Sequence, residues 1–531
     1  MMRMMKVLAN HPVVMTTRGI NVKSLTVIHE FTSKMTTLQQ YSLSPILPPN
    51  NETEDIPSRK SNVASRLIKE GSLLGVQKLG ERQLLVFDTR KLWEKVDGIN
   101  DGIEKFSEAK AMAKKIALSK MLAKRNEAFA IMNLGTVVER YGEWKANMPR
   151  VKPFYAVKCN NDPVLLGTLA KLGAGFDCAS KLELDTIVKG KLCSPNGVIY
   201  ANTCKTPSYI EYANKIGVRR MTFDCAEELA KIKAYHSDPQ LILRIDVTDT
   251  SATRPLDVKF GCDYVKEAPS LLKLAHDMDL EIIGISFHVG SGCQDPHVYG
   301  KAIGIAHELV EVGKSIGHKN MYILDLGGGY PGCDNEREFF GQIAAVICDS
   351  LNHYFPVGST AANGTPIQII AEPGRYFASA AVSVCATVIG ATRVPASKLT
   401  AKEEDNSRDG YMYYLDDGVY GSFSSLSSKL YTQLPKGQPL FHDENTEEGD
   451  MIPIRKRSYP SVVWGPTCDS KDQVQALTEI PKWKVGDWIY YANMGAYTAV
   501  TTTTFNGFRR PQTHYVVGDT AWNGISKRSA A

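Results

Sequence analysis

Residues 153–178 read PFYAVKCNNDPVLLGTLAKLGAGFDC, and this stretch decides the fold class. Two short apolar runs, Phe154–Lys158 and Gly175–Cys178, are typical of buried strands. The segment between them, Pro163–Leu172, has the apolar spacing of an amphipathic helix. A strand, a helix and a strand in this order predict two parallel strands that are joined by a crossover helix.

The same alternation of apolar runs and amphipathic segments continues as far as Arg375. The further strand candidates are Val198–Asn202, Met221–Cys225, Leu241–Asp246, Ile282–Gly290, Met321–Gly329 and Ile367–Arg375. The helix candidates include Ser208–Ile216, Ala226–Tyr235, Ala268–Met278 and Ala302–Ile316. Eight strands over about 220 residues predict a closed (β/α)8 barrel, and a doubly wound open sheet is the alternative architecture.

Segments rich in β-branched and aromatic residues flank this alternation. Those after residue 376 predict a C-terminal antiparallel β domain at 382–531 and are Ala381–Ile389, Tyr413–Asp416, Ser461–Trp464, Trp488–Ala492 and Tyr497–Phe505. A strand at Gln83–Asp88, a helix around 104–124 and a strand at Ala128–Ile131 predict an N-terminal segment, 83–132, that joins the β domain. The barrel then covers 133–381. We expect exposed loops at 397–409 and 433–459 and a disordered tail at 1–62.

The 531-residue chain has an ordinary globular composition, with 43% hydrophobic and 22% charged residues. This excludes a largely disordered chain, a collagen-like fibre and a coiled coil. The formal net charge of +5 gives no reason to expect binding to nucleic acid or to an acidic membrane, and no apolar run is long enough to span a bilayer. Residues 1–34 suit a mitochondrial transit segment; an unstructured tail, or a start at Met35, is the interpretation we favour.

The 11 cysteines and 11 histidines show no metal-ligand spacing. No Cys-x-x-Cys and no His-x-x-x-His pair occurs, so we expect no metal site and an organic cofactor. Scattered cysteines in a chain of this size indicate the reduced thiols of a cytoplasmic protein.

Polar residues gather where the predicted barrel strands end, and the carboxyl ends of the strands are where such barrels place their active sites. These residues are Lys158, Asp177, Asn202, Asp224, Arg244, His288, Ser291, Gly327–Gly329 and Glu372–Arg375. Any one of them could be a satisfied buried polar group, but the whole set is more than a structural barrel needs.

The chemistry of this set indicates a bound aldehyde with a phosphate. Lys158 follows three apolar residues, which predicts a lowered pKa and a Schiff base with an aldehyde, although a lone lysine is more often a surface residue. The triple glycine lets backbone amides approach a phosphate, and Arg375 could grip the same group. Glu372 could pair with a protonated ring nitrogen. These features together describe a pyridoxal phosphate site.

Gly327, Gly329 and Gly332 also fit the dinucleotide pattern G-x-G-x-x-G. Pro331 stands inside the turn where the following helix should begin, and the motif comes at the seventh strand. A dehydrogenase is therefore a distant alternative.

At this point the chain resembles the eukaryotic ornithine decarboxylases, which have an alanine-racemase-like fold. The motifs that carry the resemblance lie in order between about residues 83 and 522 and are Pro153–Asn160, Gly175–Lys181, Phe287–Gly292, Asp325–Gly329, Ala371–Arg375 and Trp464–Asp469. The run Asn147–Pro153 looks most like the fungal branch.

The resemblance implies roles for individual residues. Lys158 would carry pyridoxal phosphate, Glu372 would hold its ring nitrogen and His288 would stack on its ring. Asp177, Glu183 and Arg244 would support the amine end. The other cofactor-binding residues would be Ser291, Gly328, Gly329, Pro373, Gly374, Arg375 and Tyr497.

The resemblance also implies an α-decarboxylase that is a homodimer with shared active sites. Cys468 would deliver a proton to Cα of the substrate. Cys468, Asp469 and Tyr420 would reach the site from the partner subunit.

One departure from the family concerns the substrate. Relatives that bind ornithine use two acids for its distal ammonium, of which one is present as Asp469. The other normally follows a Tyr eight residues beyond the position of Tyr420, where this chain has Ser428 and Lys429. A cation there would repel an ammonium, so we predict an ornithine-like substrate with a distal anionic group, in a diverged paralogue of a specialised pathway such as alkaloid synthesis.

Two alternatives stay open. A shifted loop would turn Lys429 to solvent. The chain would then be an L-ornithine decarboxylase that forms putrescine for polyamine synthesis. Some relatives are non-catalytic regulators, but these lose cofactor and catalytic residues that this chain retains.

Overall fold

The computed structural model describes residues 73–79, 82–87, 108–247, 259–427, 436–441 and 457–526. The chain divides into two compact units, Met1–Ser61 and Asn62–Ala531, and every described residue belongs to the second. The tail expected at 1–62 lies outside the described residues. The other predicted domain boundaries stay predictions.

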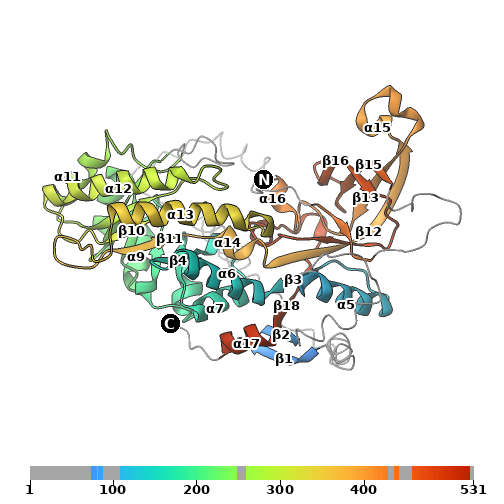
Figure 1. Ribbon diagram of the computed structural model, residues 1–531, viewed down its shortest axis with the longest axis horizontal. Coiled ribbons are helices and arrows are strands. Elements are labelled where there is room, and N and C mark those ends of the chain that lie inside the picture. The colour runs from blue at the N-terminus through green and yellow to red at the C-terminus, as the bar shows by residue number, and fades with distance from the viewer. Residues whose placement is uncertain are drawn as a thin grey trace, which may run out of the picture. The chain divides into compact units, whose positions relative to one another are not determined.

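A closed barrel of eight parallel strands forms one part of the second unit (Figure 1). Around the barrel the strands follow the order β10-β11-β4-β5-β6-β7-β8-β9, so strands that are consecutive in sequence are neighbours and β11 closes on β4. Their bounds are β4 Val151–Ala156, β5 Gly175–Cys178, β6 Val198–Tyr200, β7 Arg220–Phe223, β8 Gln240–Ile245, β9 Glu281–Phe287, β10 Ile323–Asp325 and β11 Gln368–Ala371. The predicted barrel is confirmed, and the open sheet is wrong.

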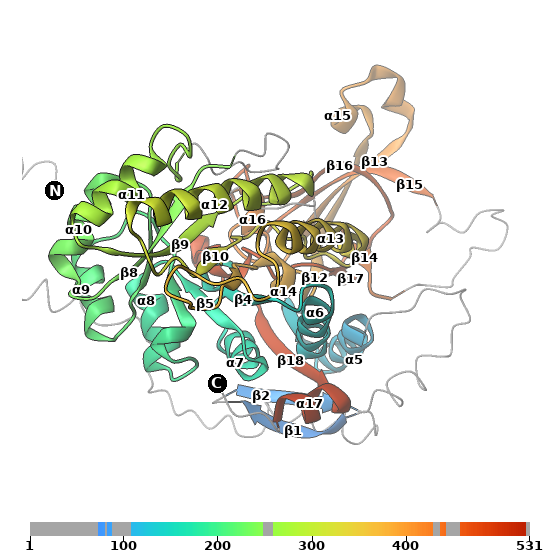
Figure 2. The same ribbon diagram turned by 60° about the vertical axis from the view of Figure 1, so that its left-hand side comes forward.

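Each barrel strand is followed by a helix, and Figure 2 shows α11, α12 and α13 on the outside of the barrel. The helices are α7 Pro163–Leu172, α8 Lys181–Leu184, α9 Pro207–Lys215, α10 Ala226–Tyr235, α11 Ala268–Asp277, α12 His297–Ile316, α13 Arg337–Tyr354 and α14 Arg375–Ala378. A further helix, α6 (Leu134–Asn147), precedes β4. None of the described helices is both long and apolar enough to cross a membrane.

The ends of α7 show how the sequence sets these boundaries. The Asp162 carboxylate accepts hydrogen bonds from the backbone N–H groups of Val164 (2.9 Å) and Leu165 (3.4 Å), which are otherwise unpaired in the first turn. Gly173 ends the helix with φ of 96°, a conformation that glycine adopts easily. The other Asp162 oxygen accepts a hydrogen bond (2.8 Å) from Tyr515, which ties α7 to the sheet of the β domain.

All the barrel strands except β5 end earlier than predicted, and three of them end earlier by three or four residues. β9, β10 and β11 stop at Phe287, Asp325 and Ala371, whereas the apolar runs predicted strands to Gly290, Gly329 and Arg375. Positive φ angles at Gly290 (97°) and Gly329 (106°) are incompatible with a strand. The polar residues of these runs therefore lie on turns at the barrel mouth.

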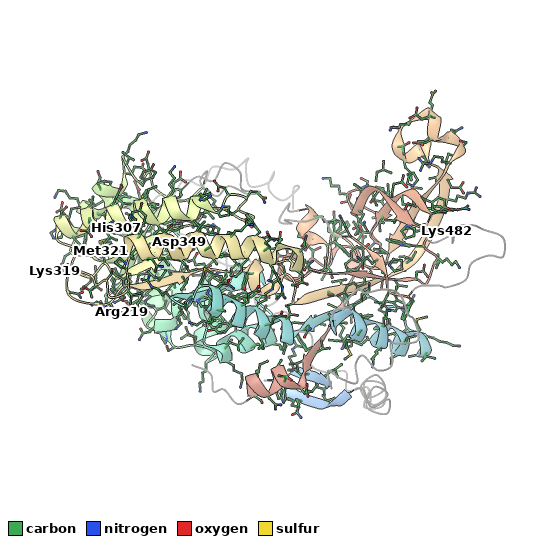
Figure 3. The ribbon with its side chains drawn as sticks, viewed as in Figure 1. Arg219, His307, Lys319, Met321, Asp349 and Lys482 are labelled. Carbon is green, nitrogen blue, oxygen red and sulfur yellow. The ribbon has the colours of Figure 1, made fainter. Side chains whose placement is uncertain are left out.

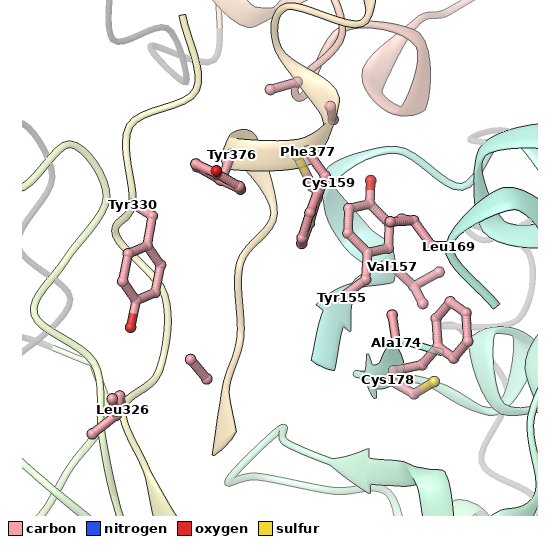
Figure 4. Packing of buried hydrophobic residues seen from close by; sticks show 14 of the residues in the cluster. Tyr155, Val157, Cys159, Leu169, Ala174, Cys178, Leu326, Tyr330, Tyr376 and Phe377 are labelled. Carbon is pink, nitrogen blue, oxygen red and sulfur yellow. The ribbon is translucent and has the colours of Figure 1, made fainter. Parts of the chain in front are cut away.

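Two apolar layers hold the barrel together. One cluster, inside it, consists of Phe154, Ile199, Ala201, Ile242, Ile283, Ile323 and Ile370. The other lies between the strands and the helices and continues into the β domain, and Figure 4 shows part of it. Its centre is aromatic: the ring of Trp144 lies 4.9 Å from that of Tyr330 and 5.3 Å from that of Tyr376. Trp144 also donates a hydrogen bond to the Val151 carbonyl (2.9 Å), so α6 is fixed to β4.

A ten-stranded sheet forms the β domain, with the order β1-β2-β18-β3-β12-β13-β15-β16; β17 also pairs with β12, and β14 pairs with β17. Its strands are β1 Leu73–Leu79, β2 Arg82–Phe87, β3 Phe129–Asn133, β12 Val382–Pro395, β13 Asp409–Leu415, β14 Gln438–Pro439, β15 Ser458–Trp464, β16 Gln473–Pro481, β17 Trp488–Tyr491 and β18 Gln512–Gly518. Most pairs are antiparallel, but β18 pairs in parallel with β2 and β3, and β13 with β15. The predicted β domain is confirmed with a mixed sheet.

The strand predicted at Tyr497–Phe505 is wrong. Tyr497 has φ of 55°, and short 3-10 turns follow at Ala499–Thr501 and Phe505–Gly507. The Thr498 hydroxyl donates a hydrogen bond to the Met494 carbonyl (2.7 Å), and the Thr501 hydroxyl donates one to the Tyr497 carbonyl (2.9 Å). These local bonds compete with strand pairing, which outweighs the β propensity of threonine.

The two predicted loops of the β domain differ in outcome. Residues 397–409 are largely exposed but contain the short helix α15 (Ser397–Thr400) and a 3-10 turn at Glu403–Ser407. They lie at the end of an arm that also carries Lys482 near Tyr411, with 5.6 Å between the ammonium and the ring centre (Figure 3). Within 433–459, β14 pairs with β17 and Leu440 is fully buried, so an exposed loop is wrong for that part.

Candidate active site

The predicted cofactor-binding residues meet at the carboxyl ends of the barrel strands. Lys158 lies in a single 3-10 turn after β4, and Asp177 and Arg244 lie near the ends of β5 and β8. His288 and Ser291 follow β9, Gly328 and Gly329 follow β10, and Glu372–Arg375 follow β11. The barrel thereby brings together residues that are separated by more than 200 positions in sequence.

Lys158 and Asp177 form an ion pair at the centre of the site. The lysine side chain is 42% exposed because it lines the open mouth of the barrel, whereas the Asp177 side chain is fully buried. Burial favours the neutral amine, but the nearby charges of Asp177 and Glu372 outweigh this effect and raise the pKa of Lys158. The prediction of a lowered pKa is wrong, because it considered the neighbours of Lys158 in sequence and not those in space.

His288 is a neutral imidazole in this environment. Burial lowers its pKa well below the usual range, and the positive charges of Arg244 and Lys158 act in the same direction. Its Nδ1 accepts a hydrogen bond from the backbone N–H of Gly290 (3.0 Å), so the remaining proton is on Nε2. The Nε2 edge faces Gly328, where an added Cβ would lie only 2.7 Å from it.

Glycines and Arg375 form a second part of the site. The guanidinium of Arg375 donates a hydrogen bond to the Ser291 hydroxyl (2.9 Å) and lies 4.7 Å from the ring centre of Tyr497. An added Cβ at Gly374 would lie 2.9 Å from Cβ of Cys159. Position 374 therefore has no room for a side chain, and the buried guanidinium of Arg375 next to it could bind a phosphate.

Two hydrogen bonds fix the Lys158 turn to the β domain. Asn160 donates through its side-chain amide to the Gly495 carbonyl (2.8 Å), and the N–H of Tyr497 donates to the Cys159 carbonyl (2.9 Å). Tyr497 therefore reaches the barrel mouth although it belongs to the β domain. The sequence analysis assigned no role to Asn160, whose position in the Pro153–Asn160 motif was the only available signal.

The predicted substrate-binding residues lie on two turns of the β domain. Tyr420, after β13, donates a hydrogen bond from its hydroxyl to the Asp469 carboxylate, after β15. This bond lowers the pKa of Asp469, and the backbone N–H of Lys471 (3.0 Å) acts in the same direction. Cys468 is exposed, and its thiol contacts the Asn506 side-chain oxygen at 3.6 Å. Ser428 and Lys429 lie outside the described residues.

A buried carboxylate, Asp472, joins these two turns. It accepts hydrogen bonds from the N–H of Val419 (2.8 Å), the N–H of Thr467 (3.0 Å) and the hydroxyl of Thr467 (2.7 Å). An added Cβ at Gly418 or Gly465 would lie 2.2 Å from one of its oxygens. The sequence analysis missed Asp472, because only the folded turns show which groups surround it.

Family models for pyridoxal-dependent decarboxylases match both parts of the structure. The pyridoxal binding domain model matches residues 134–379, and the C-terminal sheet domain model matches residues 310–495. The ornithine decarboxylase of Panagrellus redivivus is 46% identical over 420 residues, which cover 79% of this chain and 92% of that protein. The antizyme inhibitor 2 of Xenopus laevis is 41% identical over 400 residues, which cover 75% and 82%.

The chain belongs to the ornithine decarboxylase family of pyridoxal-dependent decarboxylases. Among solved structures, the arginine decarboxylase of Paramecium bursaria Chlorella virus bound to agmatine superposes with a TM-score of 0.66 at 35% identity. That alignment covers 76% of this chain and all of the viral enzyme. The glycines at 327, 329 and 332 therefore belong to a decarboxylase barrel, and the dinucleotide-binding interpretation is wrong.

Pyridoxal 5′-phosphate is the cofactor of this decarboxylase family, and the residues of the barrel mouth fit it. The structure offers an amine at Lys158 for the aldehyde, and the cation of Arg375 with the hydroxyl of Ser291 for the phosphate. A buried oxygen of Glu372 has no hydrogen-bond partner among the described residues, which suits a ring nitrogen.

Proposed function

We propose that this chain removes the α-carboxylate of an ornithine-like L-amino acid and that Lys158 carries the cofactor aldehyde. The observation that supports this most directly is the pairing of Lys158 with Asp177, beside a Glu372 carboxyl with an unpaired buried oxygen. Pyridoxal chemistry requires an amine, a carboxylate that pairs with the ammonium form of this amine, and a second acid for the ring nitrogen.

The other residues of the barrel mouth would bind the rest of the cofactor. A neutral His288 ring can stack on an aromatic face without carrying a charge into the site. Arg244 and Glu183 would support Asp177 at the amine end. The residues that we assign to the phosphate end are Ser291, Gly328, Gly329, Pro373, Gly374, Arg375 and Tyr497.

Bound pyridoxal phosphate supplies a sink for the electron pair that stays on Cα when carbon dioxide leaves. The side chains then have to move protons and hold groups in place. When the substrate amine displaces Lys158, Asp177 keeps the freed ammonium next to the reacting atoms. Cys468 gives the proton of its Sγ to Cα, and solvent restores it.

The identity of the residue at position 429 leads us to propose a shifted substrate preference. Asp469 would meet a basic nitrogen of the substrate, and Lys429 would meet an anionic group beside it. Two like charges about 4 Å apart repel each other by about 4 kcal/mol at an effective dielectric constant of about 20. Ornithine, whose distal ammonium would face Lys429, should therefore bind about two to three orders of magnitude more weakly than a matching substrate.

Steady-state kinetics with ornithine and with carboxylate-bearing analogues test this proposal. We expect kcat/KM to favour the analogues, and the Lys429→Asp variant to reverse the order. Lys482→Asp, on the arm of the sheet, is the matched charge control and should not change the preference. Efficient formation of putrescine by the unmodified protein would refute the shifted preference.

L-Ornithine itself is the second candidate substrate, with putrescine as its product. Asp469, oriented by Tyr420, offers one acid for a distal ammonium, and the Panagrellus relative is named an ornithine decarboxylase. A polyamine role would follow if ornithine gives the highest kcat/KM of the panel. The likeness of Asn147–Pro153 to the fungal branch and the alkaloid pathway stay predictions.

A non-catalytic regulator is the third candidate, because the Xenopus relative is named an antizyme inhibitor. The presence of Lys158, Asp177, Arg375 and Cys468 favours an enzyme. Borohydride reduction of the purified protein with pyridoxal phosphate, followed by peptide mapping, distinguishes the two. Labelling of Lys158 supports the enzyme, and an unlabelled Lys158 supports the regulator.

We also propose a cytoplasmic homodimer in which each barrel receives Tyr420, Cys468 and Asp469 from a second copy of the chain. In support, Cys468 is exposed in the single chain, and all eleven cysteines are free thiols. Mixing Lys158→Ala with Cys468→Ala subunits should restore about a quarter of the wild-type activity, because half of the dimers then hold one intact site. Activity no higher than that of the parent variants would contradict shared sites.

A further inference from the structure

Three buried carboxyl groups lie near the cations Lys158 and Arg244 at the barrel mouth. Asp177, Asp325 and Glu372 are 1%, 0% and 8% exposed, respectively. Lys158 and Arg244 are the positive charges that act on Glu372, and His288 is neutral. Burial of a carboxylate without a paired cation costs free energy. A group of buried carboxyls lowers this cost when one of them stays protonated.

Asp177 does not need to keep a proton, because its carboxylate is paired directly with the ammonium of Lys158. This leaves Asp325 and Glu372, which lie on adjacent strands. Asp325 pairs in register with Ile370, two residues before Glu372, and the Glu372 N–H donates to the Gly327 carbonyl (2.6 Å). The two side chains therefore emerge next to each other at the end of β10 and β11.

Each of these two carboxyls has an oxygen without a protein donor among the described residues. One Asp325 oxygen accepts a hydrogen bond from the Gly327 N–H (3.0 Å), and its Oδ2 has no partner. Glu372 Oε1 likewise has none. The other titratable groups that act on Asp325 are Asp177, Arg244 and Tyr330, a phenol whose pKa is raised well above its usual range by burial and so stays neutral.

We propose that Asp325 is protonated in the cofactor-loaded enzyme and donates a hydrogen bond to Glu372, which makes it a positioning residue. This inference rests on the proposed function, in which a protonated ring nitrogen faces Glu372. That positive charge favours the ionised form of Glu372, so the proton that the pair retains moves to Asp325. A charge-assisted O–H···O bond then replaces repulsion between two anions and fixes the orientation of the Glu372 carboxylate.

The pKa values of the pair are consistent with one shared proton. Burial raises the pKa of Asp325 to about 7, and burial together with Asp325 and Asp177 raises the pKa of Glu372 well above its usual range, so without the cofactor the retained proton lies on Glu372, which donates to Asp325. Two interacting acids of this kind lose their protons in two separate steps, so one proton remains at neutral pH.

Replacing Asp325 by asparagine tests whether this residue acts as a neutral hydrogen-bond donor or as an anion. In Asp325→Asn the amide oxygen can still accept from the Gly327 N–H, and the amide N–H can donate to Glu372. In Asp325→Ala both bonds are lost. Asp177→Asn is the matched comparison, because there the ionised form is required by Lys158.

The measurement is the dissociation constant of pyridoxal phosphate from each cofactor-free protein, followed by visible absorbance. We expect Asp325→Asn to bind within about threefold of the wild type, and Asp325→Ala and Asp177→Asn to bind at least about tenfold more weakly. If Asp325→Asn is weakened as much as Asp325→Ala, Asp325 acts as an anion and the inference is overturned. If both bind like the wild type, Asp325 has no positioning role.

Infrared difference spectra decide the question even if the alanine variant does not fold. The loaded wild type should show the C=O stretch of a protonated carboxyl that shifts in heavy water and is missing in Asp325→Asn. Equal spectra would overturn the inference. Failure of the wild type itself to bind pyridoxal phosphate would instead refute the proposed function, so the two failures are distinguishable.

Discussion

The barrel mouth and the two turns of the β domain hold their functional groups in opposite ways. At the barrel mouth, Asp177 and Glu372 are buried at the ends of parallel strands, and their charges determine the protonation of their neighbours. On the turns, Cys468 is exposed, and backbone hydrogen bonds to the single carboxylate of Asp472 hold the two segments together. Changes in the first region should therefore affect cofactor binding, whereas changes in the second should affect only turnover of substrate.

The largest effect is expected for Lys158→Ala. Loss of the amine removes both the covalent link to the cofactor and the partner of the buried Asp177, so kcat/KM should fall at least about a thousandfold. Absorbance of the bound cofactor should change as well. Lys152→Ala, at an exposed position of β4, is the matched control and should behave like the wild type. A Lys158→Ala protein that still bound the cofactor covalently would contradict the assignment.

Cys468→Ala should show most clearly that the turns affect turnover whereas the barrel mouth affects cofactor binding. If the thiol acts as the acid that protonates Cα, kcat should fall by roughly two to four orders of magnitude, with an unchanged dissociation constant for pyridoxal phosphate. Cys204→Ala, which also removes an exposed thiol, should leave both quantities unchanged. A parallel loss of cofactor affinity would show that the turns and the barrel mouth are not independent.

A smaller effect is expected for Asp472→Asn. The carboxylate accepts three hydrogen bonds, and an amide would replace one acceptor oxygen by a donor that faces the N–H and hydroxyl of Thr467. Loosening of the turns should lower kcat/KM about tenfold, without a change in cofactor affinity. Glu479→Gln, at an exposed position of β16, serves as the control. Wild-type kcat/KM in Asp472→Asn would mean that the turns do not need this carboxylate.

The two regions also differ in how far the sequence alone predicts them. The barrel mouth was predictable because strand–helix alternation places every strand end on one rim, so Lys158, His288 and Glu372 could be assigned before the structure was known. The pKa shift of Lys158 was predicted with the wrong sign, because Asp177 becomes its neighbour only when β4 and β5 pair.

The turns were predictable only where motifs resembled those of the family. Asp472 joins Val419 to Thr467 across 48 positions, and nothing in the local sequence indicates that these groups meet. The threonines after Tyr497 have the composition of a strand, but their hydroxyls bond to nearby carbonyls and form turns instead. Side-chain to backbone bonds of this kind depend on the folded path of the chain and are poorly predicted by propensity.

The smallest effect should come from Tyr420→Phe, which tests whether the turns respond to pH separately from the barrel mouth. The hydroxyl of Tyr420 donates to Asp469 and is the main cause of the lowered pKa of that carboxyl. Without this bond the pKa of Asp469 rises, so the carboxylate is lost at a higher pH and the acid limb of the kcat/KM profile should move upward in pH. The shift should be small, because the N–H of Lys471 continues to stabilise the carboxylate. Absorbance of the bound cofactor between pH 5 and 8 should match the wild type, as it should in the control Tyr459→Phe. An altered cofactor spectrum with an unmoved acid limb would place Tyr420 at the cofactor and not at the distal end of the substrate.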